Sequence, residues 1–255
     1  MISPNADGKP YLSSQDRKST SLTIEIHADA AAACRRGAAW ITEIAKQAVE
    51  QRGRFLLALS GGSTPQRMLG SLAAEAIEWH NVHVVQVDER VAAMDSPERN
   101  LTQLRDALLA HVPIPAGQVY PMPVESPDLV AAAESYGRLL NRLAGSPPVL
   151  DLIQLGLGAD GHTASLVPGD AALEVCRADV AVTAAYSGRR RMTLTFPIIN
   201  RARRILWLVT GADKAEVVAR LVLGDPSLPA SRISREPALL LVDHAAAAHL
   251  ASQGT

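Results

Sequence analysis

Short apolar runs alternate with longer amphipathic segments over most of this chain. Brief runs that are partly β-branched are typical of buried strands, and apolar residues that recur every three or four positions are typical of helices. The pattern predicts strands at residues 55–59, 82–87, 149–155, 180–184, 191–195, 205–209 and 238–242. It predicts helices at residues 28–51, 97–110, 128–143 and 213–223. The segments 113–127 and 224–237 contain several prolines and are predicted to be surface loops.

The alternation of strands and helices predicts an α/β fold. Several of the strands are continuous apolar runs, which is the pattern of parallel strands buried on both faces. We therefore expect a Rossmann-like, doubly wound, mainly parallel sheet with helices on both faces. No linker-like segment divides residues 21–255, so we predict a single α/β domain there. Residues 1–20 are polar without an apolar core segment, and we expect a disordered lead-in, neither a signal peptide nor a membrane anchor.

Composition narrows the classes of partner. The 255 residues carry a net charge of −1, and the 25 basic side chains are spread along the chain with few aromatics to stack on bases. A nucleic-acid partner is therefore not expected. No apolar run reaches the roughly 18 residues that a membrane span requires, which predicts a cytoplasmic protein without a membrane partner. Cys34 and Cys176 show no disulfide framework and no paired metal-ligand spacing, in keeping with a reducing compartment.

A glycine-rich turn follows the predicted strand at 149–155. It reads Gly156-Leu157-Gly158-Ala159-Asp160-Gly161-His162-Thr163 and opens at the carboxyl end of the strand, the edge at which open α/β sheets bind ligands. Its glycines also satisfy the G-x-G-x-x-G pattern of dinucleotide-binding folds. That pattern needs a long helix after the last glycine, but Pro168-Gly169 leaves room only for a short one. The acidic residue expected about 20 positions on is matched only by Asp179, which precedes its strand, so we do not favour a dinucleotide.

His162 and Asp160 are the candidate catalytic residues of this turn. A free imidazole has a pKa of about 6.5 and is well matched to taking a proton from water at neutral pH. Asp160 lies close enough in sequence to hold the imidazole of His162 in the required tautomer. The chain contains no G-x-S-x-G nucleophile elbow, so we expect water to be the attacking group. The other histidines form no cluster with acidic residues, and neither a metal nor another cofactor is expected.

A second glycine turn follows the predicted strand at 55–59. Its candidate phosphate-binding residues, which precede Pro65, are Ser60, Gly61, Gly62, Ser63 and Thr64. Two glycines let the backbone curl, and the hydroxyls and a helix N-terminus provide donors for a phosphate. The alternative is an ordinary strand-to-helix turn with a Ser or Thr N-cap. The loop lacks the Lys of a Walker sequence, so a nucleoside triphosphate is not indicated.

Charged residues accompany three further predicted strands. Asp88-Glu89-Arg90 comes after the strand at 82–87, and structural ion pairing is the alternative to a role in the site. Lys214 falls in the first turn of the helix at 213–223, where its positive charge is repelled by the positive end of the helix dipole. An anion bound there would remove this repulsion, and a solvated lysine is the alternative. Alternation within 191–195 places Arg191 and two threonines on one face, so Arg191 can be a second phosphate ligand. The predicted binding residues outside the loop are thus Asp88, Arg90, Gly158, Arg191 and Lys214.

Five segments together resemble the 6-phosphogluconolactonase family and occur in that family's order. They are Ser-Gly-Gly-Ser-Thr-Pro at 60–65, Asp-Glu-Arg at 88–90 followed by Asn100, Gly-Leu-Gly-Ala-Asp-Gly-His-Thr-Ala-Ser-Leu at 156–166, Arg-Met-Thr-Leu-Thr at 191–195 and Thr-Gly-Ala-Asp-Lys at 210–214. The resemblance extends from about Leu22 to the C-terminal region, and residues 160–166 are its most specific part.

The resemblance implies a metal-independent hydrolase of the pentose phosphate pathway. Such an enzyme opens 6-phospho-D-glucono-1,5-lactone to 6-phosphogluconate, on a Rossmann-like fold shared with glucosamine-6-phosphate deaminases. It also implies that Lys214 and Arg191 lie near the phosphate, while Asn100 matches the family without a role that we assign. We expect His162 to deprotonate a water that attacks C1, the imidazolium to protonate the departing ring oxygen, and backbone N–H groups of the glycine turns to stabilise the oxyanion.

Two other functions are compatible with the same segments. The deaminase branch shares the phosphate loop and the Asp-Gly-His turn, but it carries a Glu five residues after the His, where this chain has Val167. Deaminases also have an Asp-Glu-Tyr triplet where this chain has Asp88-Glu89-Arg90, which is the form found in lactonases. A non-catalytic phosphosugar-binding regulator would bind 6-phosphogluconate without hydrolysing the lactone. The sequence makes no prediction of the oligomeric state.

Overall fold

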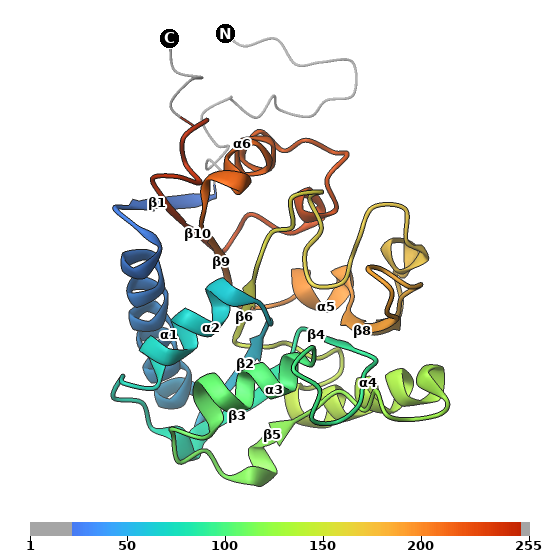
Figure 1. The fold of residues 1–255 in the computed structure, drawn as a ribbon. Coiled ribbons are helices and arrows are strands. Elements are labelled where there is room, and N and C mark those ends of the chain that lie inside the picture. Colours follow the sequence, from blue (N-terminus) through green and yellow to red (C-terminus); the bar gives the residue numbers. More distant parts are fainter. Residues whose placement is uncertain (1–21, 251–255) are drawn as a thin grey trace, which may run out of the picture.

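A parallel sheet of seven strands forms the centre of the molecule (Figure 1). The computed structural model describes residues 22–250, and the lead-in predicted at residues 1–20 lies outside this range. The strand order is β1-β10-β9-β6-β2-β3-β5, and every neighbouring pair runs parallel. The strands are β1 (Thr23–His27), β2 (Phe55–Leu59), β3 (Val82–Gln86), β5 (Val119–Tyr120), β6 (Leu152–Leu155), β9 (Ile205–Val209) and β10 (Ala238–Asp243).

Helices cover both faces of this sheet because its strands are apolar on both sides. The main helices are α1 (Ala30–Arg52), α2 (Ser63–Leu72), α4 (Leu129–Ala144) and α6 (Ala215–Leu223). Leu57 and Leu59 of β2 belong to one hydrophobic cluster with side chains of α1 and α2. Leu56 and Ala58 point the other way, into a second cluster with side chains of α4 and α6. Two-sided burial of this kind is typical of doubly wound α/β folds, and the predicted fold class is confirmed.

A separate three-stranded sheet is the antiparallel part of the fold. It consists of β4 (Asp88–Arg90), β8 (Arg191–Leu194) and β7 (Val180–Val182), in the order β4-β8-β7. The strands predicted at 180–184 and 191–195 therefore lie outside the parallel sheet. A tight turn with Ser187 (φ 51°) and Gly188 (φ 78°) joins them, whereas a parallel connection needs a crossover of about a dozen residues or more.

Several elements were not predicted. The edge strand β1 leaves Ile26 49% exposed and lacks the continuous apolar run that marks the central strands. β5 has only two residues and lies inside the predicted loop at 113–127, and α5 (Phe196–Asn200) directly follows β8. The short helix expected after the glycine turn at 156–163 is absent, because the chain there forms turns up to a 3₁₀ turn at Ala171–Glu174.

The helix predicted at 97–110 begins at Asn100 instead. The carboxylate of the buried Glu89 accepts the backbone N–H groups of Asn100 and Leu101, both at 2.8 Å, and so fixes the first turn of α3 (Asn100–Leu104). This cap, from a residue 11 positions earlier in the chain, places the start at Asn100 and not at the predicted residue 97. The helix then continues as one π-turn (Arg105–Leu109), closed by a 3.0 Å bond from the N–H of Ala110 to the carbonyl of Arg105.

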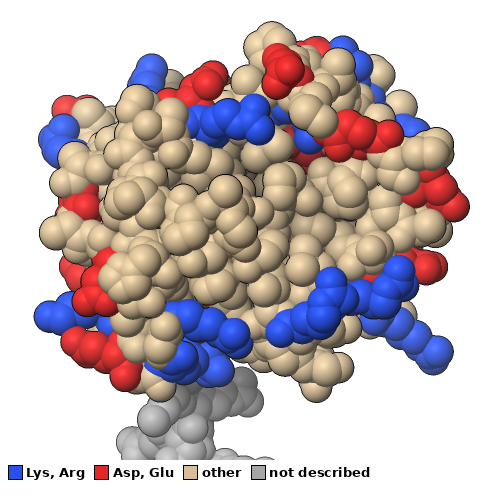
Figure 2. Space-filling view, turned by 90° about the horizontal axis from the view of Figure 1, so that it is seen from below, with Lys and Arg blue, Asp and Glu red and all other residues tan. Residues whose placement is uncertain are grey.

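The carboxyl ends of the parallel strands meet at one edge of the sheet. The segments that follow β2, β3, β6 and β9 carry the predicted site residues except Arg191, which begins β8 of the second sheet. On the face in Figure 2, charged side chains lie around the margin, with Lys and Arg gathered mainly along one side of it and uncharged residues in the centre. Within residues 22–250, no helix has the length and apolar character needed to cross a membrane.

Candidate active site

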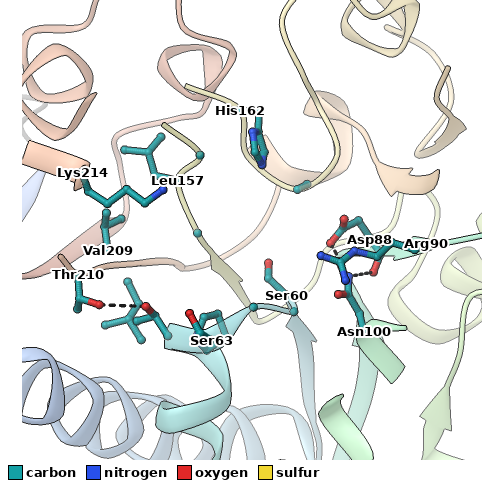
Figure 3. A pocket seen from close by; sticks show the side chains of 18 of the residues that line it. Ser60, Ser63, Asp88, Arg90, Asn100, Leu157, His162, Val209, Thr210 and Lys214 are labelled. Atoms are coloured by element: carbon teal, nitrogen blue, oxygen red, sulfur yellow. Dashed lines mark hydrogen bonds between the residues drawn. The ribbon is translucent and has the colours of Figure 1, made fainter. Parts of the chain in front are cut away.

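A cavity of about 270 Å³ opens at the carboxyl edge of the parallel sheet. The predicted phosphate loop at 60–64 lines it together with Asp88, Arg90, Gly158, His162, Arg191 and Lys214. In Figure 3, His162 lies across the cavity from Ser60, with Lys214 on one side and Asp88 and Arg90 on the other. Asp160 is not part of the wall but contacts His162 directly. The structure thus brings all the predicted site residues to one place.

The loop between β2 and α2 is anchored by two glutamine side chains. The N–H of Ser60 donates to Gln154 Oε1 at 3.2 Å, and the hydroxyl of Ser60 donates to the Gln154 carbonyl at 2.8 Å. The N–H of Gly62 donates to Gln103 Oε1 at 3.0 Å. These bonds hold the curl in place, so Ser60 and Gly62 shape the loop while the start of α2 supplies the N–H groups that have no partner within the helix.

Two further contacts fix the loop against neighbouring segments. The hydroxyls of Thr64 and Thr210 lie 2.9 Å apart, which joins the loop after β2 to the end of β9. A Cβ atom on Gly61 would lie 1.9 Å from Asn100 Oδ1. Only glycine at position 61 therefore lets the side-chain amide of Asn100 come this close to the loop.

His162 is held by the carboxylate of Asp160. The distance from His162 Nδ1 to Asp160 Oδ1 is 2.6 Å, and the backbone N–H of His162 donates to the same oxygen at 3.2 Å. The hydroxyl of Tyr186 donates to Asp160 Oδ2 at 3.1 Å. Partial burial acts to raise the pKa of Asp160, but the hydrogen bonds and the charge of His162 outweigh it and leave this pKa below its usual value. The carboxylate thus stays an acceptor that fixes the imidazole.

Gly158 makes room for this pair. A Cβ atom at position 158 would lie 2.1 Å from His162 Nδ1 and 2.7 Å from Asp160 Oδ1, so any side chain there collides with both. The N–H of Gly158 donates to the His162 carbonyl at 2.8 Å, and the N–H of Gly161 donates to the Gly158 carbonyl at 3.0 Å. Both amides are therefore used inside the turn. Neither is then free to donate to an oxyanion, and which amides of the glycine turns do so stays a prediction.

The triplet after β3 divides into two roles. Asp88 is buried below the cavity, where Ser165 Oγ donates to its Oδ2 at 2.5 Å and Asn100 Nδ2 donates to its Oδ1 at 3.1 Å. Burial raises the pKa of Asp88, although the Ser165 bond and the charges of Arg90 and Arg191 act against it. Arg90 and Arg191 line the cavity on the same side as this buried carboxyl.

Glu89, in contrast, points into the protein. Its carboxylate caps α3 and lies 3.1 Å from Arg99 Nε, and both side chains are fully buried. Structural ion pairing, the alternative for the whole triplet, therefore applies to Glu89, whereas Asp88 and Arg90 line the cavity.

Lys214 lies at the opposite side of the cavity from Arg90. It is the residue before α6, and its side chain extends toward Leu157 of the glycine turn (Figure 3). Its Nζ lies 3.5 Å from a carboxylate oxygen of the exposed Asp213. A lysine at a helix start is opposed by the helix dipole, and a weak surface pair with Asp213 offsets this only in part. The position suits an anion bound between Lys214 and the start of α2.

Sequence reasoning missed Tyr186 and Ser165 and gave Asn100 no role. Ser165 lies within the glycine-turn segment that carries the resemblance, and its spacing from His162 could have marked it. Tyr186 had no such signal, because it reaches Asp160 only through the turn between β7 and β8. Among residues 22–250, no group of three or more His, Cys, Asp or Glu side chains is arranged to hold a metal ion.

Comparison with known proteins identifies relatives along most of the chain. A family model described as glucosamine-6-phosphate isomerases/6-phosphogluconolactonase matches residues 28–241. A protein named 6-phosphogluconolactonase from Mycobacterium tuberculosis is 44% identical over 219 residues, which cover 80% of this chain and 89% of that protein. A protein of the same name from Synechocystis is 40% identical over 186 residues, which cover 71% of this chain and 77% of that protein.

Solved structures of proteins with these names have a similar fold. The 6-phosphogluconolactonase from Trypanosoma brucei has a TM-score of 0.80 and 30% identity, and the match covers 90% of this chain and 99% of that chain. A structure described as a monomeric glucosamine-6-phosphate deaminase has a TM-score of 0.77 at 22% identity, covering 89% of this chain and all of that chain. At that identity the likeness shows the shared fold alone.

Proposed function

The chain belongs to the glucosamine-6-phosphate isomerase/6-phosphogluconolactonase family, and on that premise we propose that it hydrolyses 6-phospho-D-glucono-1,5-lactone to 6-phosphogluconate, a step of the oxidative pentose phosphate pathway. It is an enzyme of the hydrolase branch, since relatives between 36% and 44% identical are named 6-phosphogluconolactonase. His162, Asp160 and the residues around the cavity are the groups to which we assign the chemistry.

The hydrogen bond between Asp160 and His162 at the wall of the cavity carries the proposal. At 2.6 Å it joins Nδ1 of the imidazole, which leaves Nε2 as the basic nitrogen. His162 lines the cavity while Asp160 does not. The arrangement matches a general base whose tautomer and orientation are set by a carboxylate behind it.

The proposed reaction proceeds in two proton transfers and needs no metal. His162 Nε2 takes a proton from a water molecule as its oxygen bonds to C1 of the lactone, giving a tetrahedral oxyanion. As the bond from C1 to the ring oxygen breaks, the imidazolium returns the proton to that oxygen, which becomes the C5 hydroxyl. The new carboxylic acid ionises at neutral pH. Asp160 stabilises the imidazolium between the two steps without itself being protonated.

Basic groups and hydroxyls around the cavity are proposed to bind the 6-phosphate. Lys214 and the start of α2 lie on one side, with the hydroxyls of Ser63 and Thr64 in the same wall. Arg191 and Arg90 add positive charge from the second sheet. Guanidinium and ammonium groups with helix N-terminal amides are the usual ligands of a phosphate dianion.

Val167 favours the lactonase activity over the deaminase alternative. It occupies the position, five residues after His162, at which deaminases have a Glu for ring opening, and it is 5% exposed among core residues. An aliphatic side chain cannot transfer protons. We therefore expect no ammonia release from glucosamine 6-phosphate. A non-catalytic regulator remains the second alternative, and turnover of fresh lactone distinguishes it.

The test is the substitution His162→Ala. His111→Ala is the matched control, because His111 is an exposed histidine whose Nε2 lies 2.9 Å from the Asp106 carbonyl oxygen, away from the cavity. Proton release from fresh lactone, corrected for spontaneous opening in a buffer blank, measures turnover. We expect His162→Ala to lower kcat by about 10²- to 10⁴-fold, with 6-phosphogluconate binding by calorimetry retained and His111→Ala unaffected. Unchanged turnover in His162→Ala would refute the assignment.

Several expectations from the sequence stay predictions. A cytoplasmic location, the single domain at 21–255 and the lack of a nucleic-acid partner are among them. Independence of metal ions is another, and dialysis against a chelator checks it: we expect the wild-type rate before and after treatment.

A further inference from the structure

Tyr186 contacts both members of the proposed catalytic pair. Its hydroxyl donates to Asp160 Oδ2 at 3.1 Å, while His162 Nδ1 bonds the other oxygen, Oδ1, at 2.6 Å. Its ring also lies edge-on to the imidazole, with 5.4 Å between ring centroids and an interplanar angle of 66°. The carboxylate of Asp160 is therefore fixed at both oxygens, and the imidazole is packed on one side by the same residue that fixes its partner.

A tight hairpin turn gives Tyr186 this position. The N–H of Tyr186 donates to the Arg189 carbonyl at 2.9 Å, and the N–H of Arg189 donates back at 3.3 Å. Ser187 and Gly188 between them both have positive φ, which is the pattern of a two-residue type I′ turn. The turn extends the hairpin of β7 and β8, so the tyrosine is carried by a paired backbone.

Tyr186 also contacts Arg191, a proposed phosphate ligand. The guanidinium carbon of Arg191 lies 5.1 Å from the centre of the tyrosine ring, within the range of a cation–π contact. Arg191 lines the cavity as well. The side chain of Tyr186 thus contacts both the proposed catalytic pair, His162 and Asp160, and a proposed phosphate ligand, Arg191.

The charges around the hydroxyl keep it a donor. Burial, the charge of Asp160 and the hydrogen bond to it raise the pKa of Tyr186, against the opposing charge of Arg191. The hydroxyl therefore stays protonated at neutral pH and can only help to hold Asp160 as an ionised acceptor.

We propose that Tyr186 is a positioning residue of the hydrolytic reaction, which acts on His162 by holding the Asp160 carboxylate through Oδ2. This inference rests on the proposed function. Without the hydroxyl, the carboxylate has one fixed oxygen instead of two, and its hold on the imidazole loosens during the step in which His162 carries the proton. The hydroxyl affects turnover, whereas the ring, through Arg191, also affects substrate binding.

Two substitutions separate the hydroxyl from the ring. Tyr186→Phe removes only the bond to Asp160 and keeps the contacts with His162 and Arg191. We expect it to lower kcat about 3- to 10-fold, as for loss of a partly exposed hydrogen bond to a charged group, with KM changed less than about twofold. Tyr186→Leu should lower kcat further and raise KM, because Arg191 loses its aromatic partner.

Tyr120→Phe is the matched control. Tyr120 lies on β5 at the far edge of the sheet, where its hydroxyl bonds His83 Nδ1 at 3.0 Å. The same change of one atom, again with loss of a hydrogen bond, should leave kcat and KM at wild-type values. Melting temperatures of all variants show whether any loss of activity follows from unfolding.

A double-mutant cycle tests whether Tyr186 acts through Asp160. In an Asp160→Asn background the hydroxyl has no carboxylate to hold, so adding Tyr186→Phe should lower kcat less than about twofold further. An equal loss in both backgrounds would overturn the proposed route. So would a Tyr186→Phe enzyme with wild-type kcat while His162→Ala is impaired. If instead the wild-type protein fails to accelerate lactone opening, or His162→Ala is unimpaired, the proposed function itself fails.

Discussion

Gly158 offers a direct test of the site, because a single methyl group there should displace the proposed base. In Gly158→Ala the new Cβ would begin 2.1 Å from His162 Nδ1 and 2.2 Å from its Cε1. Ordinary contact starts at 3.4 Å, so the ring must retreat by about 1.3 Å. Asp160 Oδ1 lies 2.7 Å from the same Cβ and has to move as well.

The size of the effect follows from this displacement. The imidazole cannot retreat and keep its 2.6 Å bond to Asp160 unless the carboxylate moves in concert, and Tyr186 holds the carboxylate at its other oxygen. A catalytic group misplaced by about 1 Å typically lowers the rate about 10²-fold. We therefore expect kcat/KM of Gly158→Ala to fall about 10²-fold or more. Loss of the bonds between Asp160 and His162 should lower stability by about 1 kcal/mol, in part offset by the reduced freedom of the unfolded chain.

Gly156→Ala provides the control within the same turn. A Cβ atom at position 156 would meet nothing within 4 Å, so this variant should retain most of the activity in the proton-release assay. Thermal unfolding of both variants measures their stability. If Gly158→Ala retains wild-type kcat/KM, the collision with His162 does not displace the base. If both variants lose activity equally, the collision is not the cause of the loss.

Three further substitutions test other parts of the structure. Lys214→Ala should raise KM about 10-fold with kcat retained if the lysine serves phosphate binding, and steady-state kinetics with an unaltered KM would remove it from the site. Glu89→Gln leaves the fully buried Arg99 without one of its two carboxylate partners and should lower the free energy of unfolding by about 3 kcal/mol in urea titrations; a loss well under 1 kcal/mol contradicts the structural role. Because the pKa of Asp160 is lowered on folding from 3.8, its ionised form contributes stability above that pH and loses it as the pH falls. The gap in melting temperature between wild type and Asp160→Asn should therefore narrow as the pH falls below 3.8, and a constant gap would contradict the lowered pKa of Asp160.

Local patterns predicted those parts of the fold that depend on local sequence. The strand at 205–209 has the predicted bounds, because a continuous apolar run buried on both faces has no other stable place. The phosphate loop, the glycine turn and Lys214 were placed together by one rule, that parallel strands end at a common edge. The rule does not place Arg191, which reaches the cavity from β8 of the antiparallel sheet.

The parts that were missed depend on contacts between distant residues. Glu89 lies on β4 and caps α3, so the start of that helix is set by a carboxylate outside the helical pattern itself. The role of Tyr186 requires knowing that β7 and β8 form a hairpin beside the glycine turn. The N–H groups of Gly158 and Gly161 donate within their own turn, which depends on backbone geometry that glycine spacing alone does not determine.

The pairing of β1 with β10 sets the order in which the protein can be completed during synthesis. β1 is the first described strand to leave the ribosome, yet its partner β10 is the last. Until β10 emerges, the edge of the sheet formed by β9 has no neighbour on that side. Lys214 also follows β9, so a nascent chain that has already exposed His162 still lacks part of its anion site. Catalytic competence should therefore arise only after β10 has emerged and closed the sheet.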